Sequence, residues 1–149
     1  MGSLRSFVTL HMEKYGWIAR IAVISFFGVG GALASQDPEV VPRRMVIIGT
    51  TFFFLASLLN GWWILRLGRA SDTRDWSRPR WTGSPFRSPP QFFHMAAWSF
   101  VSFGIANLLP IALRGGSPMF GALALAAGSG LLIGMRLFYL QSDKGGRAA

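Results

Sequence analysis

Residues 66–91, RLGRASDTRDWSRPRWTGSPFRSPPQ, form the long polar stretch of an otherwise apolar chain and decide how it is organised. This stretch separates two halves, each with two long apolar runs. A helix rises about 1.5 Å per residue, so about 20 apolar residues cross a bilayer core about 30 Å thick. The sequence therefore predicts an all-α polytopic membrane protein. We expect four transmembrane helices, arranged as two hairpins joined by a basic, proline-rich loop.

The apolar runs and the breaks between them set the expected boundaries. The first break contains Pro38 and Pro42 beside acidic residues, and the last runs from Arg114 to Pro118 through two glycines; both compositions interrupt helices. We predict an interfacial segment over 1–16, a first hairpin over 17–65, the loop over 66–91, a second hairpin over 92–140 and a polar tail over 141–149. The predicted spans are 17–35, 45–65, 92–113 and 119–140.

The first apolar run has a second interpretation. Arg5, Lys14 and Arg20 precede it, and Ala32-Leu33-Ala34 has the small-residue pattern of a signal-peptidase site. A leader ending there would be long for a secretory signal. We therefore interpret 17–35 as a retained span.

Composition limits the class of protein. Hydrophobic residues make up 51% of the 149 residues, and charged residues only 14%, against about 25% charged residues in a soluble domain. Four spans and their connections use the whole length, which leaves no room for a separate soluble domain. The chain has no cysteine, which excludes disulfides, thiolate metal sites and a cysteine nucleophile.

The net charge of +9 predicts an orientation rather than nucleic-acid binding. No basic face free of spans exists to contact phosphates along a nucleic acid, so we expect no such partner. Twelve of the 15 Lys and Arg residues fall in the N-terminal segment, the central loop and the C-terminal side. The positive-inside rule then places both termini and the 66–91 loop in the cytoplasm, or an equivalent compartment, against anionic headgroups.

Catalytic chemistry is poorly represented in the spans. All six acidic residues lie outside them, so neither paired carboxylates nor an intramembrane carboxylate relay is available. His11 and His94 precede or open spans, and two such imidazoles on facing helices are the ligands of a b-type haem. His11 lies too far before Arg20 to reach the membrane core, so we expect no cofactor, no metal and no enzymatic activity.

Helix packing is encoded more clearly. Small residues four positions apart lay a stripe along one helix face and let another backbone approach. Such stripes occur in the first span (Gly28, Ala32) and the last (Ala122, Ala126, Gly130, Gly134). Polar residues inside spans commonly bond to a neighbouring helix or line a path; they include Arg20, Asn60 and Asn107.

The central loop is the predicted interaction surface. Its four prolines prevent a long helix, and its tryptophans stand among arginines, a combination suited to anionic headgroups or to a protein partner. The candidate interaction residues are Trp76, Arg78, Arg80, Trp81 and Arg87.

These observations favour a non-catalytic membrane accessory, assembly or interaction subunit that binds lipid and other membrane protein subunits. Two alternatives remain open at this stage. One is a channel or transporter component acting as an oligomer, with Asn60 and Asn107 along its path. The other is a haem- or quinone-associated redox subunit that uses His94 and Arg20.

Overall fold

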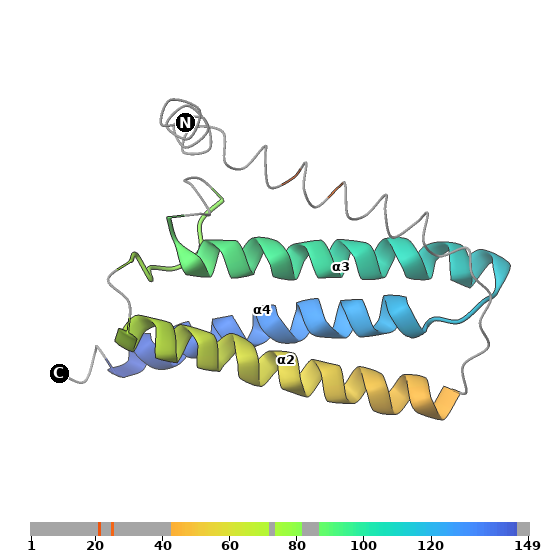
Figure 1. Ribbon diagram of the computed structural model, residues 1–149, viewed down its shortest axis with the longest axis horizontal. Coiled ribbons are helices and arrows are strands. Elements are labelled where there is room, and N and C mark those ends of the chain that lie inside the picture. Colours follow the sequence, from red (N-terminus) through yellow and green to blue (C-terminus); the bar gives the residue numbers. More distant parts are fainter. Residues whose placement is uncertain (1–20, 22–24, 26–42, 72–73, 82–86, 146–149) are drawn as a thin grey trace.

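The computed structural model describes residues 21, 25, 43–71, 74–81 and 87–145 of the chain (Figure 1). Over these residues the chain forms no strand and three long helices: α2 (Arg43–Ser71), α3 (Pro89–Arg114) and α4 (Met119–Gly145). Each is long and apolar enough to cross a membrane, with candidate spans Arg43–Ala70, Pro89–Leu113 and Met119–Asp143. Over the described residues the predicted all-helical class is confirmed, and three helices of membrane-spanning length support the predicted integral membrane character. The predicted segment 1–16 and most of the predicted span 17–35, including Arg20, Gly28 and Ala32, lie outside the described residues.

The central helix of the arrangement is α4, which packs against both α2 and α3 (Figure 1). Gly49 and Gly61 of α2 lie against positions 123 and 131 of α4, so these two helices run parallel. The α3–α4 pair runs the other way, because Gly104 meets the start of α4 whereas Ala97 meets Gly128. The chain thus brings the ends of α2 and α4 together with the start of α3.

Local sequence explains where α3 begins and ends. Its first two residues are prolines, which suit the first turn because their missing N–H would find no partner inside the helix. At the other end, the N–H of Gly115 donates to the carbonyl oxygen of Ile111 at 2.8 Å. Gly115 has a φ of 82°, which only glycine adopts without strain. Pro110 lies inside the last turns without ending the helix.

All three helices run beyond the predicted spans and into predicted polar segments; α3 begins at Pro89, within the predicted 66–91 loop. The helix α2 continues past residue 65 to Ser71, and Arg69 in its last turn complements the helix dipole. Likewise α4 continues past residue 140 to Gly145, so part of the predicted tail is helical. Both extensions carry polar side chains that bond to each other at the same end of the molecule.

The buried core also lies at this end. Leu65, Met135, Phe138 and Tyr139 form a cluster in which each residue is at most 8% exposed. Trp62, Trp76, Phe93 and Leu131 pack around it. We call this the loop end, and the opposite end, around residues 115–118, the turn end.

Candidate functional site

The segment 74–81 of the central loop is held against the end of α4 by Tyr139. The hydroxyl of this tyrosine donates to the carbonyl oxygens of Ser77, at 3.1 Å, and Trp76, at 3.3 Å. The phenol ring is buried in the core cluster. An aromatic side chain with an apolar body and a hydrogen-bonding tip therefore fixes the loop backbone to the helices.

Trp76 provides the second attachment. Its indole ring packs against the core cluster and covers the backbone of Gly68 on α2. A Cβ atom at Gly68 would overlap the ring, so the absence of a side chain there makes room for the tryptophan. The loop thereby contacts both α2 and α4.

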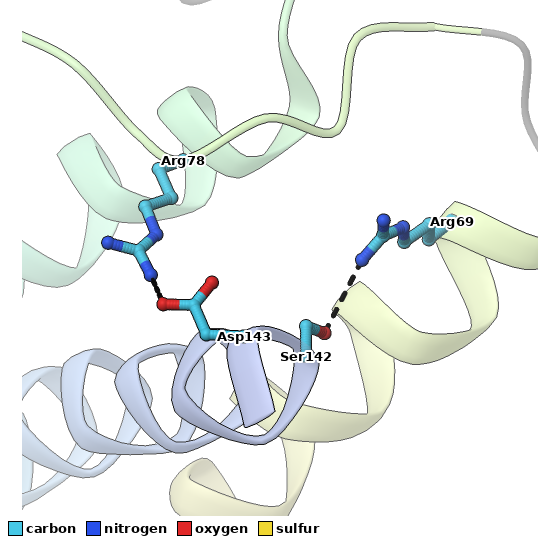
Figure 2. A network of polar contacts seen from close by, with 4 residues as sticks. All are labelled: Arg69, Arg78, Ser142 and Asp143. Carbon is cyan, nitrogen blue, oxygen red and sulfur yellow. Dashed lines mark hydrogen bonds and ion pairs between the residues drawn. The ribbon is translucent and has the colours of Figure 1, made fainter. Parts of the chain in front are cut away.

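Charged contacts join the same elements (Figure 2). Arg78 of the loop forms an ion pair with Asp143 of α4, and its guanidinium carbon lies 5.9 Å from the centre of the Tyr139 ring. Arg69 of α2 donates to the hydroxyl of Ser142 at 3.3 Å. Figure 2 shows the two arginines approaching the end of α4 from opposite sides. The Arg78 pair is half exposed, so it adds less to stability than the buried contacts do.

A local turn shapes the segment between these contacts. The N–H of Ser77 donates to Oδ1 of Asp75 at 2.8 Å. This hydrogen bond to the charged carboxylate, helped by the Ser77 side chain and by Arg80, lowers the pKa of Asp75 below its usual value. Ser88, immediately before α3, donates its hydroxyl to the carbonyl oxygen of Asp75 at 3.2 Å. The start of α3 is thereby joined to the loop.

Trp81 marks the outer edge of the described loop. Its ring lies 5.9 Å from the ring of His94 and 6.5 Å from that of Trp98, both on the first turns of α3. The indole N–H of Trp98 donates to Nε2 of His94 at 3.3 Å. Trp81 is nevertheless 42% exposed. Its side chain therefore contacts α3 and remains accessible from outside the molecule.

The five predicted interaction residues therefore divide into two sets. Trp76 and Arg78 are used within the molecule, where they attach the loop to α2 and α4. Arg80, Trp81 and Arg87 are exposed around the start of α3. Sequence reasoning did not identify Tyr139, Asp143 or Gly68, because their roles depend on residues distant in the chain.

The small-residue stripe of α4 faces α2. A Cβ atom at Gly130 would lie 2.5 Å from the carbonyl oxygen of Phe54, and one at Gly134 would overlap the backbone of Leu58. Ala126 is 5% exposed and Ala122 half-buried. The seam at Gly130 and Gly134 thus lies inside the bundle.

A second glycine face of α4 was not predicted. Gly121 and Gly128 lie against α3, where a Cβ atom at Gly128 would come 2.6 Å from the carbonyl oxygen of Ala97. Gly104 of α3 meets α4 at Leu125 in the same way. The seven-residue spacing of the two α4 glycines, which returns to one helix face, is the signal that would have identified them.

The polar span residues Asn60 and Asn107 occupy different depths. Asn107 is 3% exposed, close to Gly121 near the turn end. Asn60 is exposed, and its neighbour Gly61 lies against Leu131. Positions 121 and 131 are separated by about 15 Å of helix rise. The two asparagines therefore do not combine into one polar site.

The cavities between the helices and the loop differ in character. An apolar cavity of about 620 Å³ is lined by Phe53 of α2 and by residues of α3 and α4, including Phe103 and Phe120. A polar cavity of about 530 Å³ lies at the loop end among Arg69, Arg74 and Arg78.

Residues 43–71, 74–81 and 87–145 contain no group of three His, Cys, Asp or Glu side chains able to hold a metal ion. Nε2 of His94 accepts the Trp98 hydrogen bond, and His11 lies outside the described residues. Comparison of the chain with protein-family models, curated proteins and solved structures found no match.

Proposed function

We propose that this chain is a non-catalytic subunit of a membrane protein complex, acting in accessory, assembly or interaction roles through its loop end. In this proposal residues 17–35 supply a fourth span, so that the spans form two hairpins. Both termini and the central loop then lie in the cytoplasm or an equivalent compartment. The gathering of Arg66, Arg69, Arg136 and the loop arginines at the loop end agrees with that orientation.

The observation that carries the proposal is the fixed position of the loop. Tyr139, Trp76 and the Arg78–Asp143 pair attach residues 74–78 to the helices. Trp81 follows them and is 42% exposed next to the exposed Arg80. A surface ordered before binding loses less conformational entropy when a partner docks. Tryptophan and arginine are also the residues most enriched among those that dominate binding energy.

A co-purification experiment with matched variants tests the proposal. The tagged chain is purified from its native membrane in mild detergent, and associated proteins are quantified by mass spectrometry. The test variant is Arg80→Ala with Trp81→Ala. The control, Arg44→Ala with Trp63→Ala, removes the same residue types from exposed positions on α2.

We expect the wild-type chain and the control to retain a common set of membrane proteins. The amount of these proteins that co-purifies with the test variant should fall at least tenfold, while the helix content of the variant stays unchanged. Equal retention by the test variant and the control would refute the loop end as the binding surface. A wild-type chain that purifies alone and monodisperse would refute the subunit proposal itself.

A further inference from the structure

The polar cavity at the loop end has a wall that carries a net positive charge. Three guanidinium groups, those of Arg69, Arg74 and Arg78, line it against one carboxylate, that of Asp143. The ion pair with Arg78 already neutralises this carboxylate (Figure 2). Arg69 and Arg74 are both exposed side chains, so the cavity is suited to an anion that arrives from outside.

Hydrogen-bond donors of the cavity wall match the chemistry of a phosphate. The planar fork of a guanidinium group donates two parallel hydrogen bonds to phosphate oxygens. The hydroxyls of Ser77 and Ser142 line the same wall. The Trp76 side chain completes the wall beside them. The volume of about 530 Å³ accommodates a phosphate with its ester substituents.

The depth of the cavity indicates where the phosphate comes from. Arg69 lies one residue before the end of the candidate span Arg43–Ala70, and Asp143 is the last residue of the span Met119–Asp143. The cavity is therefore at the level where both helices leave the apolar core. Lipid headgroups occupy this layer of a bilayer, and clustered arginines at this level attract anionic lipids.

We propose that the cavity bounded by Arg69, Arg74 and Arg78 is a specific site for the phosphodiester headgroup of an anionic membrane lipid. The Arg78–Asp143 pair forms one wall and stays intact when the lipid binds. Arg69 and Arg74 supply further guanidinium donors on the cavity wall. The site is independent of the protein-docking surface at Trp81, which lies against the start of α3.

Native mass spectrometry of the full-length protein in detergent tests the site. The protein is titrated with phosphatidylglycerol and, separately, with phosphatidylcholine of the same acyl chains. The test variant is Arg69→Gln with Arg74→Gln. The control, Arg43→Gln with Arg44→Gln, removes the same charge from exposed residues at the other end of α2. A third variant, Arg69→Lys with Arg74→Lys, keeps the charge but loses the forked donors.

We expect the wild-type protein and the control to bind one phosphatidylglycerol at least tenfold more tightly than phosphatidylcholine. The glutamine variant should lose this preference, and the lysine variant should show an intermediate one. A glutamine variant that keeps the preference for phosphatidylglycerol would overturn the site. An equal loss of this preference in the control would do the same. Inorganic phosphate in large excess should leave the bound lipid in place; displacement by phosphate would instead identify a free phosphate compound as the ligand. A glutamine variant that fails to fold would leave the lysine variant to decide, and full lipid preference there would overturn the guanidinium contacts.

Discussion

The loop end and the turn end of this molecule are built differently although the same three helices form both. At the loop end, Leu65 is 1% exposed, and side chains from α2, α4 and the central loop interlock. At the turn end, Leu113 is 79% exposed and Phe120 is 67% exposed. A short turn capped by Gly115 joins α3 and α4 there.

The difference shows what the polar residues of a small membrane protein contribute. In lipid, apolar side chains gain little by leaving their surroundings, so association relies on close backbone approach and on hydrogen bonds. Glycines allow the close backbone approach along α4, and the hydrogen bonds between elements are concentrated at the loop end. Order at that end therefore depends on a few identifiable side chains, and each can be removed separately.

The largest effect is expected from Gly134→Ala, which places a methyl group against the backbone of Leu58 on α2. Overpacking against backbone typically costs about 1–3 kcal/mol, and we expect a corresponding fall in the unfolding midpoint measured by circular dichroism in detergent. Gly49→Ala is the matched control, since its Cβ would meet only the flexible end of Leu123 at 3.3 Å. Equal midpoints for the two variants would show that the α2–α4 approach is looser than described.

A smaller effect is expected from Tyr139→Phe, which removes the hydroxyl that holds Trp76 and Ser77. The lost hydrogen bonding costs about 1 kcal/mol, so the loop should open about fivefold more often. Trypsin should cleave after Arg80 correspondingly faster. Ser129→Ala is the control, because its hydroxyl bonds only within α4, to Leu125 at 2.7 Å and to Ala126. Unchanged cleavage in the tyrosine variant would mean that the loop is held by other contacts.

Asp143→Asn should have a weaker effect on the same cleavage rate. The pair with Arg78 is half exposed, and such pairs contribute between about 0 and 1 kcal/mol. Because salt screens exposed charges, the difference from wild type should shrink as ionic strength rises. An increase in cleavage rate that exceeds the increase in Tyr139→Phe and persists at high salt would assign the main role to the ion pair.

The smallest effect concerns the Asp75 turn. The N–H of Ser77 lowers the pKa of this carboxyl group, so the turn gains stability above the unfolded pKa and loses it as pH falls through the lower folded pKa. The amide resonance of Ser77, followed by NMR, should keep its shift well into the acid range and then change. In Asp75→Asn this titration should vanish. A midpoint at the ordinary value for aspartate would contradict the hydrogen bond.

The sequence predicted the parts of this structure that depend on composition and short spacing. Long apolar runs located the three described spans, and the four-residue repeat containing Gly130 and Gly134 identified one face of α4 that packs. The second face, with Gly121 and Gly128, has a seven-residue spacing that also indicates one helix face. Helix ends were predicted less well: α2 and α4 continue through polar residues after 65 and 140, and α3 begins at Pro89 rather than at residue 92.

Folding of the loop end could not be predicted in the same way. Tyr139 and Trp76 are 63 residues apart in sequence, and no local pattern links them. Gly68 resembles a helix-ending glycine until the ring above it is known. Trp76 and Arg78 resembled solvent- or partner-facing residues for the same reason, although the structure places both in contacts with the helices.

Crosslinking in the membrane tests most directly the central claim that the loop is fixed against the end of α4. The chain has no cysteine, so two can be introduced without background. Ser77→Cys with Ser142→Cys places both on the wall of one cavity. Ser77→Cys with Ser117→Cys places them at opposite ends of α4, about 35 Å apart by helix rise. A short bismaleimide should crosslink the first pair within one molecule and leave the second pair unlinked. Equal yields for the two pairs, or none for the first, would contradict the account.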